Sequence, residues 1–307
     1  MDGLILVDKP RGATSHDIVA RVRRCLGIRK VGHFGTLDPL ATGLLLVAVG
    51  RAVKLFPLYS KHDKAYAGEI QLGLATDTYD ATGQPTSPRK DALPGREAVV
   101  EAMRSFEGEI LQTPPPYSAK KVSGKPLYKW ARGRKEVSCP PRPVTVHSFG
   151  LVDFRPPAVE FEVRCGSGTY VRSLAHDLGR MLGCGAHLTG LRRITIGAFD
   201  IGDAVPLERL QSLPADALDR CLLPADALLA ALPRVDLDSH QTADLLQGRA
   251  VAMPGAAPGT TWRVYGAGRF LGIARAGGDG FLAPARLIAT AGRGAANSLE
   301  NSAGNPV

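Results

Sequence analysis

A single carboxylate, Asp38, lies in a glycine- and threonine-containing segment in which residues 32–43 read GHFGTLDPLATG. The chain around it is basic, with 38 Lys and Arg against 29 Asp and Glu and a net charge of +9. Phosphates repel a carboxylate, so Asp38 would be a poor residue for holding a polyanion. The contrast therefore indicates a chemical role for Asp38, as a nucleophile or in proton removal.

Length and composition predict an ordinary globular protein. The 307 residues suit one core domain of roughly 200–250 residues and a small second domain. The surplus of positive charge favours a nucleic acid or another acidic partner, although on charge alone a basic but unrelated enzyme remains open. No run approaches the ~18 apolar residues of a membrane span, and the start does not resemble a signal peptide. We therefore expect a cytoplasmic protein that makes no membrane contact.

The cysteines argue against a metal site or a disulfide framework. They are five in number and scattered along the chain, and neither a C-x-x-C pair nor an H-E-x-x-H motif occurs. Reduced thiols in the cytoplasm are the expectation.

Hydrophobic patterning places the candidate residues on regular elements. Residues 3–7 read as a strand, and Ser15 is predicted to cap a following helix. The continuous apolar run 44–49 is typical of a buried strand, and residues 64–72 are another strand candidate. Asp38 thus falls in a loop between two buried elements.

Further elements are predicted in the second half of the chain. Alternation over residues 159–165 predicts a half-buried strand, and a Gly-Ser-Gly turn leads into a helix from Thr169 onwards, with Arg172 near its start. An Ala/Leu pattern bounded by prolines predicts helix between about residues 212 and 233.

Residues 113–143 form a basic insert with eight Lys or Arg against one acid, Glu136. Its aromatic residues, Tyr117, Tyr128 and Trp130, are interleaved with these cations. The cations are Lys120, Lys121, Lys125, Lys129, Arg132, Arg134, Lys135 and Arg142. Cations neutralise phosphates and aromatic rings stack on bases, so the mixture favours contact with RNA or DNA over a merely solvated face.

After Pro233 the pattern changes to short strands separated by glycine-rich turns. Residues 234–289 predict a small β-rich domain with one helix over 240–246. The tail, residues 290–307, consists mostly of Gly, Ala, Asn and Ser and is predicted to be disordered.

These segments together resemble the TruB family of tRNA pseudouridine synthases over nearly the whole chain. The resemblance rests on segments that occur in the family's order and at its spacing. They are 6–10 (LVDKP), 32–43 (GHFGTLDPLATG), 63–66 (DKAY), 73–83 (GLATDTYDATG), 116–121 (PYSAKK), 168–173 (GTYVRS), and 183–188 (GCGAHL) through to 191–193 (LRR).

The resemblance implies a fold, a reaction and a substrate. The fold is α+β: residues 1–233 would form the pseudouridine synthase core, a mixed, mostly antiparallel sheet flanked by helices, and residues 234–289 a PUA-like RNA-binding domain. The activity is that of an isomerase, converting uridine 55 in the T-loop of tRNA to pseudouridine after flipping the base into a pocket. The insert matches the thumb that closes over RNA, and the terminal domain would contact the acceptor stem. A monomer without cofactor, metal or obligatory protein partner is expected.

The resemblance also implies the site residues. Asp38 matches the catalytic aspartate, and Arg172 the cation beside it. Tyr66 would stack on the flipped uracil or take the C5 proton, and His33 would help to displace the base. The remaining matches are Tyr170 and Leu191 as pocket residues, Lys9 near the active-site loop, and Lys120, Lys121, Lys125, Lys129 and Arg132 in the thumb.

The reaction that the resemblance implies requires neither a metal nor a redox cofactor. Pseudouridylation detaches uracil from C1′, rotates it and rejoins it through C5, with no atoms gained or lost. Asp38 could attack C1′, attack uracil C6, or remove a sugar proton to form a glycal, and the sequence leaves these routes open. Burial disfavours a charged carboxylate and a neighbouring cation offsets that effect, which is the expected role of Arg172. Asp77 and Asp80 are expected to bond the loop backbone or the RNA, without catalytic work.

Three other functions are possible. The related catalytic subunit of guide-RNA particles is less consistent with the well-developed insert. A non-catalytic RNA-binding or RNA-folding protein would need only the basic insert and the terminal domain. A glycoside hydrolase usually needs two acids near the scissile bond, and no second acid occurs in a comparable motif.

Overall fold

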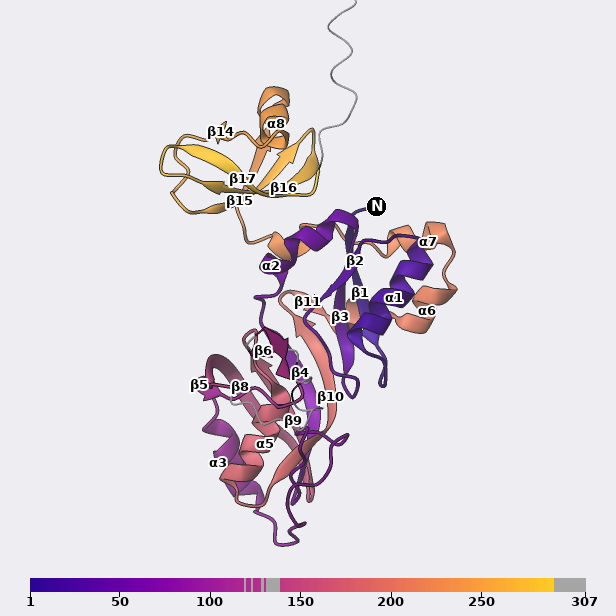
Figure 1. Ribbon diagram of the computed structural model, residues 1–307, viewed down its shortest axis with the longest axis vertical. Helices are drawn as coiled ribbons and strands as arrows, with labels where there is room; N and C mark the ends of the chain where they lie inside the picture. Colours follow the sequence, from indigo (N-terminus) through magenta and orange to yellow (C-terminus); the bar gives the residue numbers. More distant parts are fainter. Residues whose placement is uncertain (119, 123, 128–129, 131–138, 290–307) are drawn as a thin grey trace, which may run out of the picture. The chain divides into compact units, whose positions relative to one another are not determined.

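The computed structural model describes residues 1–118, 120–122, 124–127, 130 and 139–289 (Figure 1). The chain divides into two compact units. One joins Ile5–Val47 with Tyr59–Cys221, and the other joins Met1–Leu4 and Ala48–Leu58 with the described part of Leu222–Val307. The predicted domain boundary between residues 233 and 234 stays a prediction.

A large mixed sheet organises the first unit. Its strands lie in the order β12-β1-β3-β10-β4-β9-β8-β5, with β2 beside β3 and β11 beside β10. Neighbours from β10 to β5 are antiparallel, whereas β3 and β10 run parallel. The strands are β1 (Gly3–Lys9), β2 (Val31–Phe34), β3 (Thr42–Val49), β4 (Lys64–Leu72), β5 (Gly108–Gln112), β8 (Arg142–Arg155), β9 (Ala158–Cys165), β10 (Ala186–Ile196), β11 (Phe199–Asp200) and β12 (Val205–Pro206). The predicted α+β class with a mostly antiparallel sheet is confirmed.

Burial along the strands follows the sequence pattern. The run from Leu44 to Val49 in β3 is fully buried, as its continuous apolar character predicts. Residues of β9 alternate, with Val159, Phe161 and Val163 buried between more exposed residues. The strand predicted over residues 64–72 is β4 itself.

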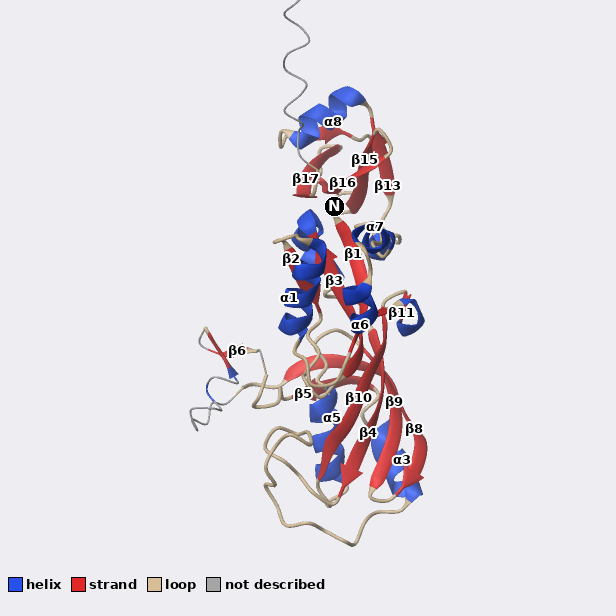
Figure 2. Ribbon diagram, turned by 90° about the vertical axis from the view of Figure 1, so that its right-hand side faces the viewer, coloured by secondary structure: helices blue, strands red, loops and turns tan. Residues whose placement is uncertain are grey.

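Helices α3 (Arg96–Arg104) and α5 (Val171–Met181) contact each other and the long strands of the sheet (Figure 2). Val99 of α3 and Leu174 of α5 are fully buried. The short elements are α2 (Phe56–Tyr59), α6 (Leu207–Ser212), α7 (Ala215–Arg220), the 3₁₀ helices η1 (Gly50–Leu55), η2 (Ile201–Asp203) and η3 (Ala227–Leu229), and the hairpin β6 (Lys121–Val122) and β7 (Lys125–Pro126). The prediction of helix from 212 to 233 was therefore wrong in extent, because prolines at 214 and 224 interrupt it.

The residue that caps helix α1 (Ser15–Leu26) lies one position earlier than predicted. Thr14 is the cap: its hydroxyl accepts from the Asp17 amide at 3.1 Å, and the Asp17 carboxylate accepts from the Thr14 amide at 2.8 Å. Ser15 was expected in that role, but it is buried as the first helical residue. Its hydroxyl is used elsewhere, on the loop that carries Asp38.

The C-terminal part folds around a five-stranded sheet in the order β13-β15-β16-β17-β14. Its elements are β13 (Arg234–Leu237), α8 (Ser239–Leu246), β14 (Val251–Ala252), β15 (Thr261–Gly266), β16 (Arg269–Ala276) and β17 (Phe281–Leu287). Leu245 of α8 packs with Val264, Leu271 and Leu282 in one apolar core. A small β-rich fold is thus present, as predicted, whereas the tail 290–307 lies outside the described residues.

The close contact between β3 and β10 generates a test of the fold. Gly43 has φ +98°, and a methyl group there would lie 2.4 Å from the Arg193 carbonyl oxygen and 2.7 Å from its nitrogen. Gly43→Ala combines left-handed strain with a backbone clash, so we expect it to lower the free energy of unfolding by about 3 kcal/mol or more. Gly12→Ala is the matched control, because Gly12 has φ +88° but open space around it. It should cost only about 1 kcal/mol, and equal losses in urea unfolding of the two variants would contradict the clash.

Candidate active site

A cavity of about 270 Å³ opens in the larger unit beside Asp38. Five of the seven residues predicted to form the active site line it: Asp38, Tyr66, Tyr170, Arg172 and Leu191. The wall is completed by residues 35–37, Ser60, Lys64, Ser118, residues from the 166–171 segment, and Arg193. Segments that are more than a hundred residues apart in the sequence therefore meet at one hollow.

An ion pair joins the two central residues. Arg172 Nε donates to Asp38 Oδ2 at 2.8 Å. The Arg172 side chain is 5% exposed, whereas Asp38 is 41% exposed, so the arginine is fixed in the wall and the carboxylate reaches the opening. The position of Arg172 agrees with the neighbouring cation that the resemblance implies beside Asp38.

A second carboxylate holds the same guanidinium, and sequence reasoning gave it no such role. Asp80 Oδ2 lies 3.6 Å from Arg172 Nε, and the Asp80 side chain is only 6% exposed. Its other oxygen, Oδ1, accepts from the Thr78 hydroxyl at 2.7 Å and from the Thr82 amide and hydroxyl at 3.0 and 2.6 Å. The threonines at alternate positions around Asp80 were the available signal, because they can satisfy a buried carboxylate from its own turn.

Main-chain carbonyls complete the fixing of Arg172. Its Nη1 donates to the Thr78 carbonyl at 2.9 Å and its Nη2 to the Tyr117 carbonyl at 3.0 Å. Tyr117 belongs to the start of the basic insert, so the insert is tied directly to the arginine that holds Asp38. A buried guanidinium with every edge occupied has little freedom to move.

The loop carrying Asp38 is held from both sides. The Ser15 hydroxyl donates to the Leu37 carbonyl and accepts from the Leu37 amide, at 3.1 and 2.9 Å. Beyond Asp38, the Gly12 amide donates to the Pro39 carbonyl at 2.8 Å. These bonds position Asp38 without using its own carboxylate.

The two predicted tyrosines come from different elements. Tyr66 of β4 is 7% exposed, and burial raises the pKa of its phenol above the ordinary value. Tyr170 precedes α5, and the Gln112 side chain bonds both its amide and its carbonyl, at 2.8 and 3.1 Å. Burial also raises the pKa of Tyr170, so burial disfavours the ionised form of both phenols.

Lys9 does not line the cavity but lies in the wall behind it. The side chain is fully buried, and its Nζ donates to the Pro10 and Ala13 carbonyls at 3.0 and 2.7 Å. Burial lowers the pKa of Lys9 to about 8, and the nearby Asp38 carboxylate acts against that shift. Lys9 therefore stabilises the turn between β1 and α1.

His33 also lies outside the residues that line the cavity. Its ring packs edge-on against His16, with 5.1 Å between centroids, and its buried Nδ1 has no hydrogen-bond partner. Burial, with His16 second, lowers the pKa of His33 to about 4, so the ring is uncharged at neutral pH. Its predicted part in displacing a base stays a prediction.

The basic insert is described only in part. Lys121 and Lys125 belong to the strands of the β6–β7 hairpin, and the Lys120 carbonyl accepts from the Leu127 amide at 2.7 Å. Lys129 and Arg132 lie outside the described residues.

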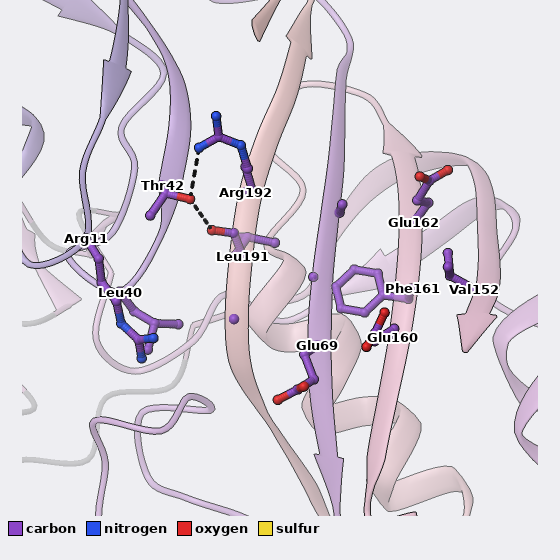
Figure 3. Close-up of a pocket in the computed structure, with 13 residues that line it drawn as sticks. Arg11, Leu40, Thr42, Glu69, Val152, Glu160, Phe161, Glu162, Leu191 and Arg192 are labelled. Atoms are coloured by element: carbon purple, nitrogen blue, oxygen red, sulfur yellow. Dashed lines mark hydrogen bonds between the residues drawn. The ribbon is translucent and has the colours of Figure 1, made fainter. Parts of the chain in front are cut away.

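A second hollow, of about 390 Å³, lies along β10, β4 and β9 (Figure 3). Three glutamates, Glu69, Glu160 and Glu162, and two arginines, Arg11 and Arg192, line it, and Leu191 is shared with the cavity beside Asp38. Its carboxylates outnumber its cations, whereas the cavity beside Asp38 has three cations against one carboxylate, so this hollow is the less suitable one for a nucleic acid. Within the described residues no group of three or more His, Cys, Asp or Glu side chains could hold a metal ion, and no helix there is long and apolar enough to span a membrane.

Comparisons with known proteins give a consistent family. Residues 23–171 match the model for the TruB family pseudouridylate synthase N-terminal domain. Residues 172–230 match the tRNA pseudouridylate synthase B C-terminal domain, and residues 233–288 match the pseudouridine synthase II TruB C-terminal model. A tRNA pseudouridine synthase B from Aromatoleum aromaticum is 47% identical over 290 residues, which are 94% of each chain. One from an Azoarcus species is 44% identical over 94% of this chain and 96% of its own.

Solved structures show the same fold at lower identity. A Cbf5-Nop10-Gar1 complex includes a chain that superposes with a TM-score of 0.72 at 24% identity, covering 94% of this chain and 85% of that one. An archaeal box H/ACA sRNP Nop10-Cbf5 complex gives 0.71 at 23% identity, covering 94% and 86%. These likenesses concern the fold alone.

The buried lysine behind the cavity generates a test by pH. The pKa of Lys9 is about 8 in the folded protein, against an ordinary 10.5. Below pH 8 the folded protein carries the full free-energy cost of a buried ammonium, and this cost falls as the pH rises towards 10.5. This contribution makes the protein more stable by about 2 kcal/mol between about pH 7 and about pH 9.5. Lys9→Met should remove that gain, as measured by urea unfolding at the two pH values. Lys30→Met, at an exposed position, is the control and should keep it.

Proposed function

Because this chain belongs to the TruB family of pseudouridylate synthases, we propose that it isomerises uridine 55 in the T-loop of tRNA to pseudouridine. The observation that carries the proposal is the ion pair between Asp38 and Arg172 at a cavity walled by Tyr66, Tyr170 and Leu191. It places a half-exposed carboxylate, with its counter-ion fixed, where a base could enter.

The reaction requires the target base to leave its stack. Inside a folded T-loop the uridine is stacked, so it must be extruded before Asp38 can reach C1′ or C6. Arg172 orients Asp38 through its 2.8 Å bond and places a positive charge beside the carboxylate. Attack at C1′, attack at C6 and glycal formation all begin from this carboxylate, and Asp38 is the catalytic residue in each.

The walls of the cavity would hold the detached uracil while it turns. Tyr66 and Tyr170 present aromatic rings for stacking, and Leu191 offers an apolar contact. Exclusion of water matters here, because a freed base that escaped would end the reaction as a hydrolysis.

RNA binding is assigned to two regions outside the cavity. The cations of the insert 113–143 would contact the T-arm backbone, and the domain 234–289 the acceptor stem. The T-loop would be recognised by its shape and its flipped bases. We further propose that the enzyme works in the cytoplasm as a monomer without a protein partner, as suits a chain matched over nearly its whole length by relatives named for one activity.

The central test removes the charge of Asp38 and little else. Asp38→Asn should lower pseudouridine formation on an unmodified tRNA by about 10³-fold or more, while RNA binding remains, because the amide cannot act as a nucleophile or base. Product is measured at position 55 on whole tRNA and on an isolated T-arm. Product formation by the variant at the wild-type rate would rule out the mechanism. No product from the wild type, with binding intact, would favour an RNA-folding protein.

A second test concerns the carboxylate behind Arg172. Asp80→Asn keeps the shape of the turn but removes one of the two carboxylate charges beside the Arg172 guanidinium. We expect kcat to fall by about 10²-fold, because Arg172 and Asp38 would be misplaced. Asp77→Asn in the same turn is the matched control, because the Asp77 carboxylate only accepts from the Gln84 amide. The idea fails if both variants lose activity equally.

A further inference from the structure

Arg193 is a buried cation that neither the ion pair nor the mechanism above uses. It lies in β10 and is 1% exposed. Its Nε donates to the Leu44 carbonyl at 2.7 Å, and its Nη2 to the Gly35 carbonyl at 2.8 Å. Gly35 precedes Asp38 and Leu44 follows it, so one guanidinium holds both ends of the segment that carries the catalytic carboxylate.

Both acceptors are neutral carbonyl groups, so neither is a counter-ion for the positive charge of Arg193. Among the described residues, no carboxylate lies within ion-pair distance of Arg193. Desolvation accordingly lowers the pKa of Arg193 from its ordinary value. A buried charge without a counter-ion is costly, so a strand residue kept in this state invites an explanation.

Tyr66 is the ionisable group that Arg193 contacts. The two residues are partners across the antiparallel pair of β4 and β10. Partners across an antiparallel pair present their side chains on the same face of the sheet, so the guanidinium and the phenol are neighbours. Both side chains line the cavity beside Asp38. The phenol and a buried positive charge therefore face the same cavity.

We propose that Arg193 is a positioning residue, which locks the Tyr66 phenol to the Asp38 loop and supplies the counter-ion for a Tyr66 phenolate. The proposal deepens the proposed function, on which it rests. In this role Arg193 stabilises the Tyr66 phenolate electrostatically, and the phenolate accepts the proton.

The proton balance of the reaction needs such an acceptor. Once C1′ is bonded to C5, the C5–H bond breaks, its electron pair returns to the pyrimidine ring, and the proton passes to the phenolate oxygen. Pseudouridine carries on N1 a proton that uridine lacks there. The proton taken from C5 is therefore balanced by the one gained at N1, with Tyr66 returning to its ionised state by way of water.

The other groups around Tyr66 oppose its ionisation or leave it unaffected. Burial raises the pKa of Tyr66 most, and Cys165 of β9 and Asp38 add to that effect, whereas Arg193 lowers it. The Cys165 thiol is itself neutral, because burial raises its pKa to about 11. Lys64, on the same strand and in the cavity wall, bonds the His62 carbonyl. Arg193 is thus the cation placed to offset burial at the phenol.

The test follows the ionisation of Tyr66 directly in the full-length protein. Tyrosines are labelled with ¹³C at Cζ, the Tyr66 signal is assigned with Tyr66→Phe, and it is followed from neutral to alkaline pH. We expect its titration to move to higher pH in Arg193→Lys and further in Arg193→Met. The lysine keeps a charge but lacks the planar fork that holds the Leu44 and Gly35 carbonyls.

Kinetics on an unmodified T-arm give the second readout. Arg193→Met should lower kcat by about 10²-fold with little change in KM, and Arg193→Lys should recover part of the loss. Arg192→Met is the matched control, because Arg192 is the neighbouring strand residue and pairs with Asp8 instead. It should leave the Tyr66 titration where the wild type has it.

An unshifted Tyr66 signal in folded Arg193→Met overturns the proposal. If that variant does not fold, as judged by circular dichroism, an unshifted signal in Arg193→Lys overturns it instead. The titration needs neither RNA nor turnover. If the wild type makes no pseudouridine, the proposed function is wrong. The titration would still show separately whether Arg193 affects Tyr66.

Discussion

The sharing of one buried guanidinium between two carboxylates is the constraint around which this structure is arranged. Arg172 is 5% exposed, and its Nε lies 2.8 Å from Asp38 Oδ2 and 3.6 Å from Asp80 Oδ2. A charge so buried must be fully satisfied, so the remaining donors take the carbonyls of Thr78 and Tyr117. Helix α5, the turn 76–82, the Asp38 loop and the start of the insert are consequently fixed to one another at a single side chain.

A second feature is the number of cations set around one exposed carboxylate. Lys64 and Arg193 line the cavity with Arg172, and Lys9 lies behind it. Burial lowers the pKa of both lysines to about 8, so part of their charge is already given up near neutral pH. Lys64, Arg172 and Arg193 still outnumber the one carboxylate, Asp38, in the cavity wall, so the cavity favours anionic groups. In the other hollow three glutamates outnumber two arginines, and anionic groups are less favoured there.

The elements that periodicity predicted correctly were those dominated by local pattern. Strand β4 and the buried run in β3 follow alternation and continuous apolar character. Errors arose where a side chain had a competing partner or where prolines interrupted a helical composition. Ser15 satisfies the rules for a helix cap, yet Thr14 takes that place, since Ser15 is bonded to Leu37 twenty-two residues away. The helix expected over 212–233 is broken into α7 and η3, because prolines interrupt an otherwise helical composition.

The sequence by itself determined the family, the α+β class and the candidate residues Asp38, Tyr66, Tyr170, Arg172 and Leu191, because these are carried by motifs of contiguous residues. Only the tertiary structure decided that Asp80 shares Arg172, that Arg193 bonds both ends of the Asp38 segment, and that His33 packs on His16 away from the cavity wall. The physical reason is that burial, and with it the balance between desolvation and ion pairing, depends on strands brought together from distant parts of the chain.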